Sequence, residues 1–320
     1  MKITVIGPGR WGSFIAWYLH RCGHEVLLYG RAGDEKYEQF RETRTNGLLT
    51  LPEGLVLGDD LVHAVESAET IIVSVGAQSY RGLLTELSAL PVDGKRLVLC
   101  MKGIEKGSGL RLSEVTAEVL GDRMRTAIWV GPGHVQDFVR GIPNCMVIDS
   151  ADEPLKKELV ESFSSDLIRF YYGGDLLGNE IGAASKNVIG IAAGMLDGLE
   201  KSSLKGALMS RGTREIARLI QAMGGNGMTA YGLSHLGDYE ATVFSQHSHN
   251  RMYGELFVKK GHYGELAEGV PTAEAMVLLA DRYGVELPIC QTVHEVLSGK
   301  VGPKEGLAGL FLRSLKDEMI

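Results

Sequence analysis

The chain has 320 residues, 44% of them hydrophobic, and a formal net charge of -7 at pH 7. This length exceeds what one hydrophobic core usually supports, so we expect two domains, and the acidic balance argues against a nucleic-acid partner. The four cysteines form no C-x-x-C pair, no apolar run reaches the roughly 18 residues of a membrane span, and the first strand follows Met1-Lys2 directly. We therefore expect a cytoplasmic protein without signal peptide, membrane span or disulfide framework.

The chain opens with a β-branched run at residues 3–6, then glycines spaced G-x-G-x-x-G, then a helical pattern over 13–19. Gly7 allows a tight turn, Gly9 lets the backbone approach a pyrophosphate, and Gly12 lets helix and strand pack closely. The positive end of the helix dipole then meets the phosphates. The pattern predicts a dinucleotide-binding turn, and the alternative is a glycine-rich turn without a ligand.

The second predicted strand, 25–29, ends at Tyr29-Gly30-Arg31. An NAD-preferring site usually offers an acidic residue to the ribose hydroxyl at this point. Arg31 can instead pair with a 2′-phosphate, so NADP is favoured as cofactor and NAD is kept as the second choice. An ordinary solvated arginine is the competing interpretation.

Five further short apolar runs follow at 70–75, 96–100, 127–130, 145–148 and 167–171, with a helical segment at 155–163. Continuous rather than alternating apolar strands are typical of a sheet that is covered on both faces. Residues 1–174 are therefore predicted to form an α/β domain around a doubly wound, mostly parallel sheet. Its ligand would lie at the carboxyl ends of the strands.

Lys102 follows the predicted strand 97–101, and such a position commonly contacts a ligand in an open α/β sheet. Its charge would stabilise negative charge that develops on an alkoxide. An exposed loop lysine is the alternative.

After Gly173-Gly174 the strand-like runs end, and long helical stretches take over at 175–199, 205–223 and 272–283. Residues 175–320 are therefore predicted to form an all-helical domain. Small residues are frequent in its first helix, which permits close packing against neighbours. Because glycine lowers helix propensity, tertiary contacts must hold this helix.

Lys186 and Asn187 lie within 181–189, a stretch of small and apolar residues. Desolvation favours a neutral amine and a nearby carboxylate favours the ammonium, so a lysine in this setting can exchange protons near neutral pH. The alternative is a lysine whose head group reaches the surface from a helix end. Asn187 would donate to a substrate oxygen, or would tie helix to loop.

Polar residues gather again between 237 and 251. Asp238 is predicted to orient and charge Lys186, with Thr242 one turn further along, and a helix N-cap is a competing, compatible role for Asp238. His247 and His249 suggest a metal site. No partner set at ligand spacing completes it, so we expect no metal.

Seven segments in order resemble the NAD(P)-dependent sn-glycerol-3-phosphate dehydrogenase family over nearly the whole chain. They are Gly7 to Gly12, Lys102 to Glu105, Gly131-Pro132, Lys186 to Val188, Gly232-Leu233 with Leu236 to Asp238, Ser248 with Asn250-Arg251, and Glu268 to Val270. The resemblance implies a Rossmann-type domain followed by a helical domain. It also implies reversible hydride transfer between glycerol 3-phosphate and dihydroxyacetone phosphate.

The same resemblance implies roles for individual residues. Lys186 would be the proton donor and acceptor, Asp238 would hold it, and Lys102 would contact both substrate and cofactor. Residues expected to line the cofactor are Arg10, Trp11, Arg31, Val135 and Glu268, and those expected to line the substrate are Gly131, Gly133, Ser248, His249 and Asn250.

Three positions depart from the family pattern near the substrate. The family usually has arginine at the place of His249, a hydroxyl residue at Gly133, and a Pro-Ser pair at Gly76-Ala77. Histidine cannot reproduce the bidentate arginine fork. We expect His249 to grip the substrate phosphate together with Arg251 and Asn250.

Two other functions stay open at this point. The first is a reductase of the same fold that acts on a different small ketone with a carboxylate, phosphonate or carrier-linked group. The second is a nucleotide-binding sensor or assembly protein without catalysis, against which the intact Lys186, Asn187 and Asp238 argue. In each enzymatic case the partner is a small-molecule substrate, and a homodimer is the assembly to be tested.

Overall fold

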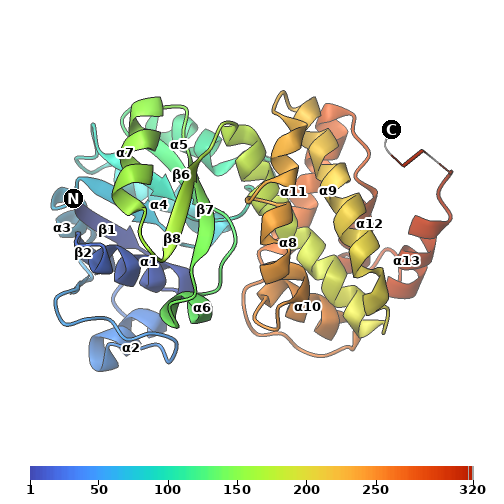
Figure 1. Cartoon of the computed structure of the whole chain (residues 1–320), viewed down its shortest axis with the longest axis horizontal. Helices are drawn as coiled ribbons and strands as arrows, with labels where there is room; N and C mark the ends of the chain where they lie inside the picture. Colours follow the sequence, from blue (N-terminus) through green and yellow to red (C-terminus); the bar gives the residue numbers. More distant parts are fainter. Residues whose placement is uncertain (316, 319–320) are drawn as a thin grey trace. The chain divides into compact units, whose positions relative to one another are not determined.

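The computed structural model describes residues 1–315 and 317–318, and the chain divides into two compact units. Unit 1 comprises Met1–Glu105 and Leu110–Glu180, and unit 2 comprises Lys106–Gly109 and the chain from Ile181 onward. The short segment in unit 2 is held by its helices, because Arg282 donates to the Ser108 carbonyl at 2.7 Å. Figure 1 labels most of the helices and several strands of the two units.

Unit 1 is built on one eight-stranded sheet with the order β3-β2-β1-β4-β5-β6-β7-β8. Its strands are β1 (Lys2–Ile6), β2 (Glu25–Tyr29), β3 (Val56–Gly58), β4 (Thr70–Val73), β5 (Arg96–Leu99), β6 (Arg125–Val130), β7 (Asn144–Asp149) and β8 (Ile168–Tyr172). All neighbours pair in parallel except β6 and β7, which are antiparallel. The prediction of a doubly wound, mostly parallel sheet is confirmed.

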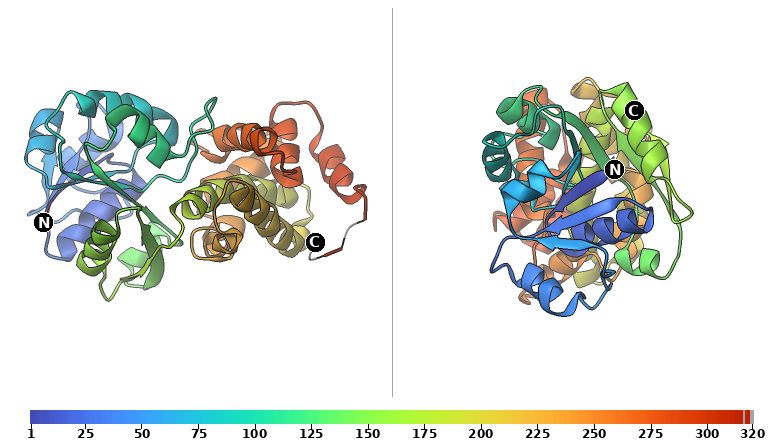
Figure 2. Two further views of the ribbon diagram at one scale, coloured as in Figure 1. Left: turned by 90° about the horizontal axis from the view of Figure 1, so that it is seen from above. Right: turned by 90° about the vertical axis from the view of Figure 1, so that its left-hand side faces the viewer.

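Helices cover both faces of this sheet, which explains the continuous apolar strands. Figure 2 shows α4 (Tyr80–Ser88) and α5 (Leu112–Leu120) on one side, and α1 (Arg10–Arg21) and α7 (Glu153–Phe163) on the other. All four residues of β4 are buried as a result. Aromatic side chains fill the α1 face, where the Trp129 ring meets that of Phe170 edge-on at 4.8 Å.

Three elements between β2 and β4 escaped the sequence analysis, namely α2 (Glu35–Thr43), β3 and α3 (Leu61–Glu66). Both helices begin with an aspartate cap: the Asp34 carboxylate accepts from the backbone N–H of Tyr37, and that of Asp60 from that of His63. Because these elements are short and expose much of their length, they lack the apolar runs that marked the other strands and helices.

Unit 2 is helical, as predicted. Its helices are α8 (Leu176–Gly198, shared with unit 1), α9 (Lys205–Ala222), α10 (His249–Val258), α11 (Gly269–Tyr283), α12 (Pro288–Leu297) and α13 (Pro303–Phe311). Short 3-10 turns lie between them, and Glu240–Phe244 forms a π-helical segment. Among the described residues, no helix has the length and apolar character needed to cross a membrane.

The small residues of α8 allow the close packing that the sequence predicted. A Cβ atom added at Gly194 would lie 1.9 Å from the Arg251 carbonyl oxygen of α10. In the reverse direction, a Cβ at Gly254 would lie 2.1 Å from the Ile191 carbonyl oxygen. The two helix backbones therefore touch, and tertiary contact holds a helix of weak intrinsic propensity.

Candidate active site

The glycine turn between β1 and α1 is closely packed against its own backbone and that of β4's end. A Cβ at Gly12 would lie 2.0 Å from the Gly7 carbonyl oxygen, and one at Gly7, whose φ is +112°, would lie 2.4 Å from the Ser74 carbonyl oxygen. A Cβ at Gly9 would meet nothing within 4 Å. Gly7 and Gly12 thus serve the fold, while Gly9 leaves open space beside the helix start.

This turn fits a dinucleotide. Gly9 is the N-cap of α1 and provides no side-chain cap for the N–H groups of the first helical turn. Such a helix start favours an anion. The Trp11 indole N–H is buried and has no hydrogen-bond partner within the described chain, as expected of a donor that awaits a ligand.

Arg31 lies just past the end of β2, as the sequence placed it. Its guanidinium pairs with Glu86 of α4 at 2.5 Å, and the two side chains are 65% and 46% exposed. An ion pair this exposed contributes little free energy, so Arg31 can leave Glu86 and pair with a ligand phosphate instead. The neighbouring Gly30 has no room for a Cβ, which would lie 2.5 Å from the Tyr37 ring.

Lys102 and Gly131 come together at the carboxyl ends of β5 and β6. The Lys102 ammonium donates to the Gly131 carbonyl at 2.7 Å and lies 5.9 Å from the centre of the Trp11 ring. Three residues predicted for cofactor or substrate therefore share one corner of unit 1. The carbonyl fixes where this positive charge lies.

Gly133 and Val135 follow Gly131 in the chain, and both contribute to the packing of this region. Gly133 has a φ of +150°, and a Cβ there would lie 2.3 Å from the Phe138 ring, so a serine or threonine does not fit. Val135 begins α6 (Val135–Val139) and is 2% exposed. Phe138 stacks on Phe14 of α1 at 4.9 Å, which ties this loop to the glycine turn.

In unit 2, Lys186 of α8 meets both residues that the sequence assigned to it. Its Nζ lies 2.7 Å from a carboxylate oxygen of Asp238 and donates to the Thr242 hydroxyl at 2.8 Å. Lys186 is 7% exposed, Asp238 1% and Thr242 2%. A buried ammonium is thus held by one carboxylate and one hydroxyl.

The backbone around Asp238 explains this geometry. Asp238 ends the 3-10 helix Leu236–Asp238 and is not an α-helix N-cap, and the π-helical segment Glu240–Phe244 follows. The Thr242 hydroxyl donates to the Asp238 carbonyl at 2.7 Å, which brings both side chains to the same side. π-Helical turns are rare in proteins, and those that occur are often found at functional sites.

His235 and Tyr239, behind this ion pair, were missed by the sequence analysis. His235 Nδ1 lies 2.8 Å from the Gly182 carbonyl oxygen, and its Nε2 lies 2.7 Å from the Tyr239 hydroxyl. A carbonyl only accepts, so Nδ1 carries the proton and Tyr239 donates to Nε2. Burial lowers the pKa of His235 to about 4, so the ring is neutral at pH 7.

The remaining predicted residues of unit 2 lie at helix starts beside α8. Ser248 caps α10, because its hydroxyl accepts from the Arg251 backbone N–H at 3.3 Å. The Asn250 side chain accepts from the Gly269 N–H at 2.8 Å, and Glu268 directly precedes α11. A Cβ at Gly269 would lie 2.6 Å from the Asn187 carbonyl oxygen, so α11 begins against the residue after Lys186.

The expected phosphate grip by Arg251 is wrong. Its guanidinium binds the carboxylates of Asp197 at 2.7 Å and Glu255 at 2.9 Å and donates to the Ser245 carbonyl, and its side chain is only 12% exposed. His249 instead contacts the hydroxyl of Tyr263, which the sequence did not single out. One signal was available: Asp197 is the next charged residue after Lys186 on α8.

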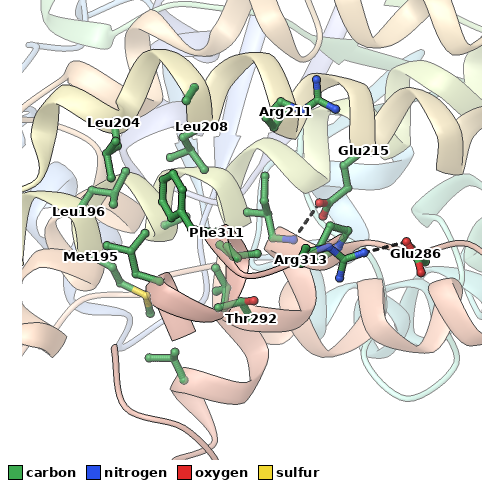
Figure 3. A pocket seen from close by; sticks show the side chains of 18 of the residues that line it. Met195, Leu196, Leu204, Leu208, Arg211, Glu215, Glu286, Thr292, Phe311 and Arg313 are labelled. Atoms are coloured by element: carbon green, nitrogen blue, oxygen red, sulfur yellow. Dashed lines mark hydrogen bonds and ion pairs between the residues drawn. The ribbon is translucent and has the colours of Figure 1, made fainter. Parts of the chain in front are cut away.

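A cavity of about 1150 Å³ lies elsewhere in unit 2, among α8, α9, α12 and α13. Figure 3 shows Phe311 among Leu196, Leu204 and Leu208, and the Glu215 carboxylate bound to a backbone N–H of α12. None of the predicted site residues lines it. Across the described residues no cluster of three His, Cys, Asp or Glu suits a metal ion.

Comparison with known families covers both units. The family described as NAD-dependent glycerol-3-phosphate dehydrogenase matches through its N-terminal part at residues 2–156 and its C-terminal part at residues 175–308. Glycerol-3-phosphate dehydrogenase (NAD(P)+) of Prosthecochloris aestuarii is 37% identical over 333 residues, which is 100% of both chains. The enzyme of the same name from Bradyrhizobium sp. is also 37% identical and covers 99% of this chain and 98% of its own.

A solved structure gives the same result. The crystal structure of glycerol-3-phosphate dehydrogenase from Coxiella burnetii superposes with a TM-score of 0.91 at 27% identity, covering 98% of this chain and 99% of that one. The similarity thus extends to both the sheet and the helices.

Proposed function

The chain belongs to the NAD-dependent glycerol-3-phosphate dehydrogenase family, and we propose that it interconverts dihydroxyacetone phosphate and sn-glycerol 3-phosphate with NADP or NAD. The observation that carries the proposal is the buried set of Lys186, Asp238 and Thr242 in a chain that matches such enzymes end to end. The relatives' names favour this substrate over the different small ketone.

The two halves of the chain divide the work. Residues 1–174 would form the cofactor domain, with the dinucleotide held by Gly7, Gly9, Arg10, Trp11, Gly12, Arg31, Lys102 and Val135. Residues 175–320 would add Glu268 to the cofactor site and supply most of the substrate site. When bound, the nicotinamide supplies or accepts the hydride. Binding of the dinucleotide's phosphates at the glycine turn is supported by the uncapped start of α1, and a ligand beside the turn by the unpaired indole N–H of Trp11.

Lys186 would move the proton. In the direction of ketone reduction it gives an Nζ proton to the carbonyl oxygen that becomes the alcohol, and in the reverse direction it takes that proton back. Asp238 holds the ammonium by charge, and Thr242 fixes its direction by a hydrogen bond. Burial excludes water that would otherwise compete for the proton.

Lys102 would stabilise negative charge on the same oxygen. Its position at the carboxyl end of β5, held by the Gly131 carbonyl, supports this role. The other groups proposed to line the substrate are Gly131, Gly133, Asn187, Ser248, His249 and Asn250.

His249 would replace arginine at the substrate phosphate, with Tyr263 anchoring one of its ring nitrogens. A histidine carries its full charge only below the ordinary imidazole pKa of about 6.5. The KM for dihydroxyacetone phosphate is therefore expected to rise between pH 5.5 and pH 8. His249→Arg should lower KM and flatten this dependence, because guanidinium stays charged. A flat wild-type profile would contradict the assignment.

The direct test is a spectrophotometric assay of NADPH and NADH oxidation with dihydroxyacetone phosphate, beside a panel of small carboxylate and phosphonate ketones. We expect turnover with dihydroxyacetone phosphate and a preference for NADPH. Turnover with another ketone alone would assign a different substrate. Tight NADPH binding without oxidation across the panel would point to a nucleotide sensor.

We also propose the cytoplasm as the site of action and a homodimer as the assembly. The four cysteines are free thiols, which suits a reducing compartment. Sedimentation equilibrium of the purified enzyme tests the dimer, and a single species of 34.7 kDa would exclude it.

A further inference from the structure

Asp197 lies on α8 eleven residues after Lys186, so the two side chains leave nearly the same face of the helix about 16 Å apart. One Asp197 carboxylate oxygen accepts from Lys205 at 2.7 Å and from Arg251 at 2.7 Å, and the other accepts from the Ser202 hydroxyl at 2.6 Å. Burial alone would raise the pKa of Asp197, but these hydrogen bonds outweigh it and hold the pKa below its usual value. The carboxylate is therefore charged.

Both cations on this carboxylate also hold the loop that carries Thr242. Lys205 donates to the Val243 carbonyl at 2.9 Å, and Arg251 donates through Nε to the Ser245 carbonyl at 2.9 Å. The Lys205 ammonium lies 5.5 Å from the centre of the Phe244 ring between them. These carbonyls lie at the end of the π-helical segment, and the Ser245 carbonyl also accepts a long backbone hydrogen bond, from the Ser248 N–H at 3.4 Å.

The segment Asp238–Ser245 is thus fastened to α8 at two separate places. At its start, Asp238 and Thr242 bind Lys186, and His235 binds the Gly182 carbonyl one turn before Lys186. At its end, the ions on Asp197 hold the carbonyls of Val243 and Ser245. Thr242 belongs to the first attachment and is followed directly by Val243, which belongs to the second.

We propose that Asp197, Lys205 and Arg251, here called the Asp197 clamp, are positioning residues that hold Thr242 where its hydroxyl directs the Lys186 ammonium. An ion network that only joined helices would need no loop carbonyl, whereas both cations here give an N–H to one. Misplacing a reacting group by about 1 Å can cost on the order of 100-fold in rate. The inference rests on the proposed proton transfer by Lys186.

Lys205→Met is the main test, because it removes the N–H to Val243, keeps an apolar stem under Phe244, and leaves Asp197 paired with Arg251. With NADPH and dihydroxyacetone phosphate saturating, kcat should fall about 10- to 100-fold. The KM for NADPH should change less than about twofold, because the clamp touches no residue proposed for the cofactor. The half-maximal point of the kcat–pH profile should move to lower pH by about half a unit, because a displaced Thr242 leaves the ammonium with one acceptor fewer.

Lys259→Met is the matched control. Lys259 is a lysine of the same network, since it pairs with Glu255 at 2.6 Å, but it is 53% exposed and donates to this carboxylate rather than to a loop carbonyl. This variant should keep the wild-type kcat and pH profile. Lys205→Arg, which retains charge and donors, should recover part of the lost rate. If Lys205→Met does not fold, Asp197→Asn replaces it, and we again expect a lower kcat and a kcat–pH profile that moves to lower pH.

Amide hydrogen exchange separates this inference from the proposed function, because it needs no turnover. Peptides covering 239–245 should exchange about tenfold faster in Lys205→Met than in wild type, and at wild-type rate in Lys259→Met. Unchanged exchange and an unchanged pH profile, with only a lower melting temperature, would overturn the clamp as a positioning device. An inactive wild-type enzyme with the expected exchange pattern would instead count against the proposed function.

Discussion

The two units hold their candidate site residues in different ways. In unit 1 the glycine turn is a local backbone feature, and three glycines within six residues shape it. In unit 2, Lys186 meets a hydroxyl that is 56 residues away in the chain, and a second set of ions secures the loop that directly follows this hydroxyl residue. In the glycine turn, each position separately has or lacks room for a Cβ atom. In the buried ion cluster, the position of Lys186 depends on each of its partners.

The energetic consequence differs as well. Removing one partner of a buried ion pair leaves an uncompensated charge, which typically costs about 3–5 kcal/mol. Filling open space at a glycine costs the fold almost nothing and obstructs only a ligand. A variant that fills open space at the glycine turn should therefore weaken ligand binding without lowering stability. A variant that removes one partner of a buried ion pair should lower stability.

The largest expected effect is on Lys186. Lys186→Ala should lower kcat about 1000-fold while NADPH still binds, because general acid catalysis is lost and the dinucleotide turn is untouched. Stopped-flow single turnover and a fluorescence titration of NADPH measure the two properties. Lys186→Arg is the control for charge, since it can keep the ion pair with Asp238 but cannot release a proton, and it should also be inactive. Near-normal hydride transfer in either variant would remove Lys186 from the reaction.

The second effect is the pH dependence of stability at His235. Its folded pKa of about 4 lies below the unfolded value of 6.5, so below pH 6.5 the unfolded chain binds more protons and the wild type loses stability as pH falls. The loss from this group is about 3 kcal/mol at pH 4. Urea unfolding of wild type and His235→Asn between pH 7.5 and pH 4 isolates it. The free energy of unfolding of the wild type should exceed that of His235→Asn by less as pH falls. A difference that stays constant with pH would contradict the lowered pKa of His235.

The third effect contrasts two glycines of one turn. Gly9→Ala should weaken NADPH binding at least about tenfold and change the free energy of unfolding by less than about 0.5 kcal/mol, because a Cβ there meets only open space. Gly12→Ala should cost about 1–3 kcal/mol of stability, because its Cβ would strike the Gly7 carbonyl. Calorimetric titration and urea unfolding report the two quantities. Equal losses of stability would mean that the turn has no separate ligand face.

The smallest effect concerns Arg31. Arg31→Ala should raise the Kd of NADPH about tenfold and leave that of NADH within about twofold, because only the former carries a 2′-phosphate. Thermal stability should stay unchanged, since the pair with Glu86 is exposed. Equal weakening of both cofactors would assign the arginine to the adenine or ribose instead.

All strands except β3 could be predicted from the sequence, as could the glycine turn and the long helices, because each has a local pattern in apolar spacing or in glycine position. The pairing of Lys186 with Asp238 was predicted from residue type and family resemblance together. The short elements between β2 and β4 were missed because they expose most of their length. The engagement of Arg251 with Asp197 was missed because it joins helices that are far apart in the chain.

The chain's own order of residues was enough to assign the fold class, the family and the residues that carry charge near the reaction. Only the folded arrangement decided which of those charges are committed elsewhere, as Arg251 is to Asp197, and why Gly133 cannot carry a hydroxyl beside Phe138. The physical reason is range: propensity and spacing act over a few residues, whereas the partner of a buried charge is chosen by packing between distant segments.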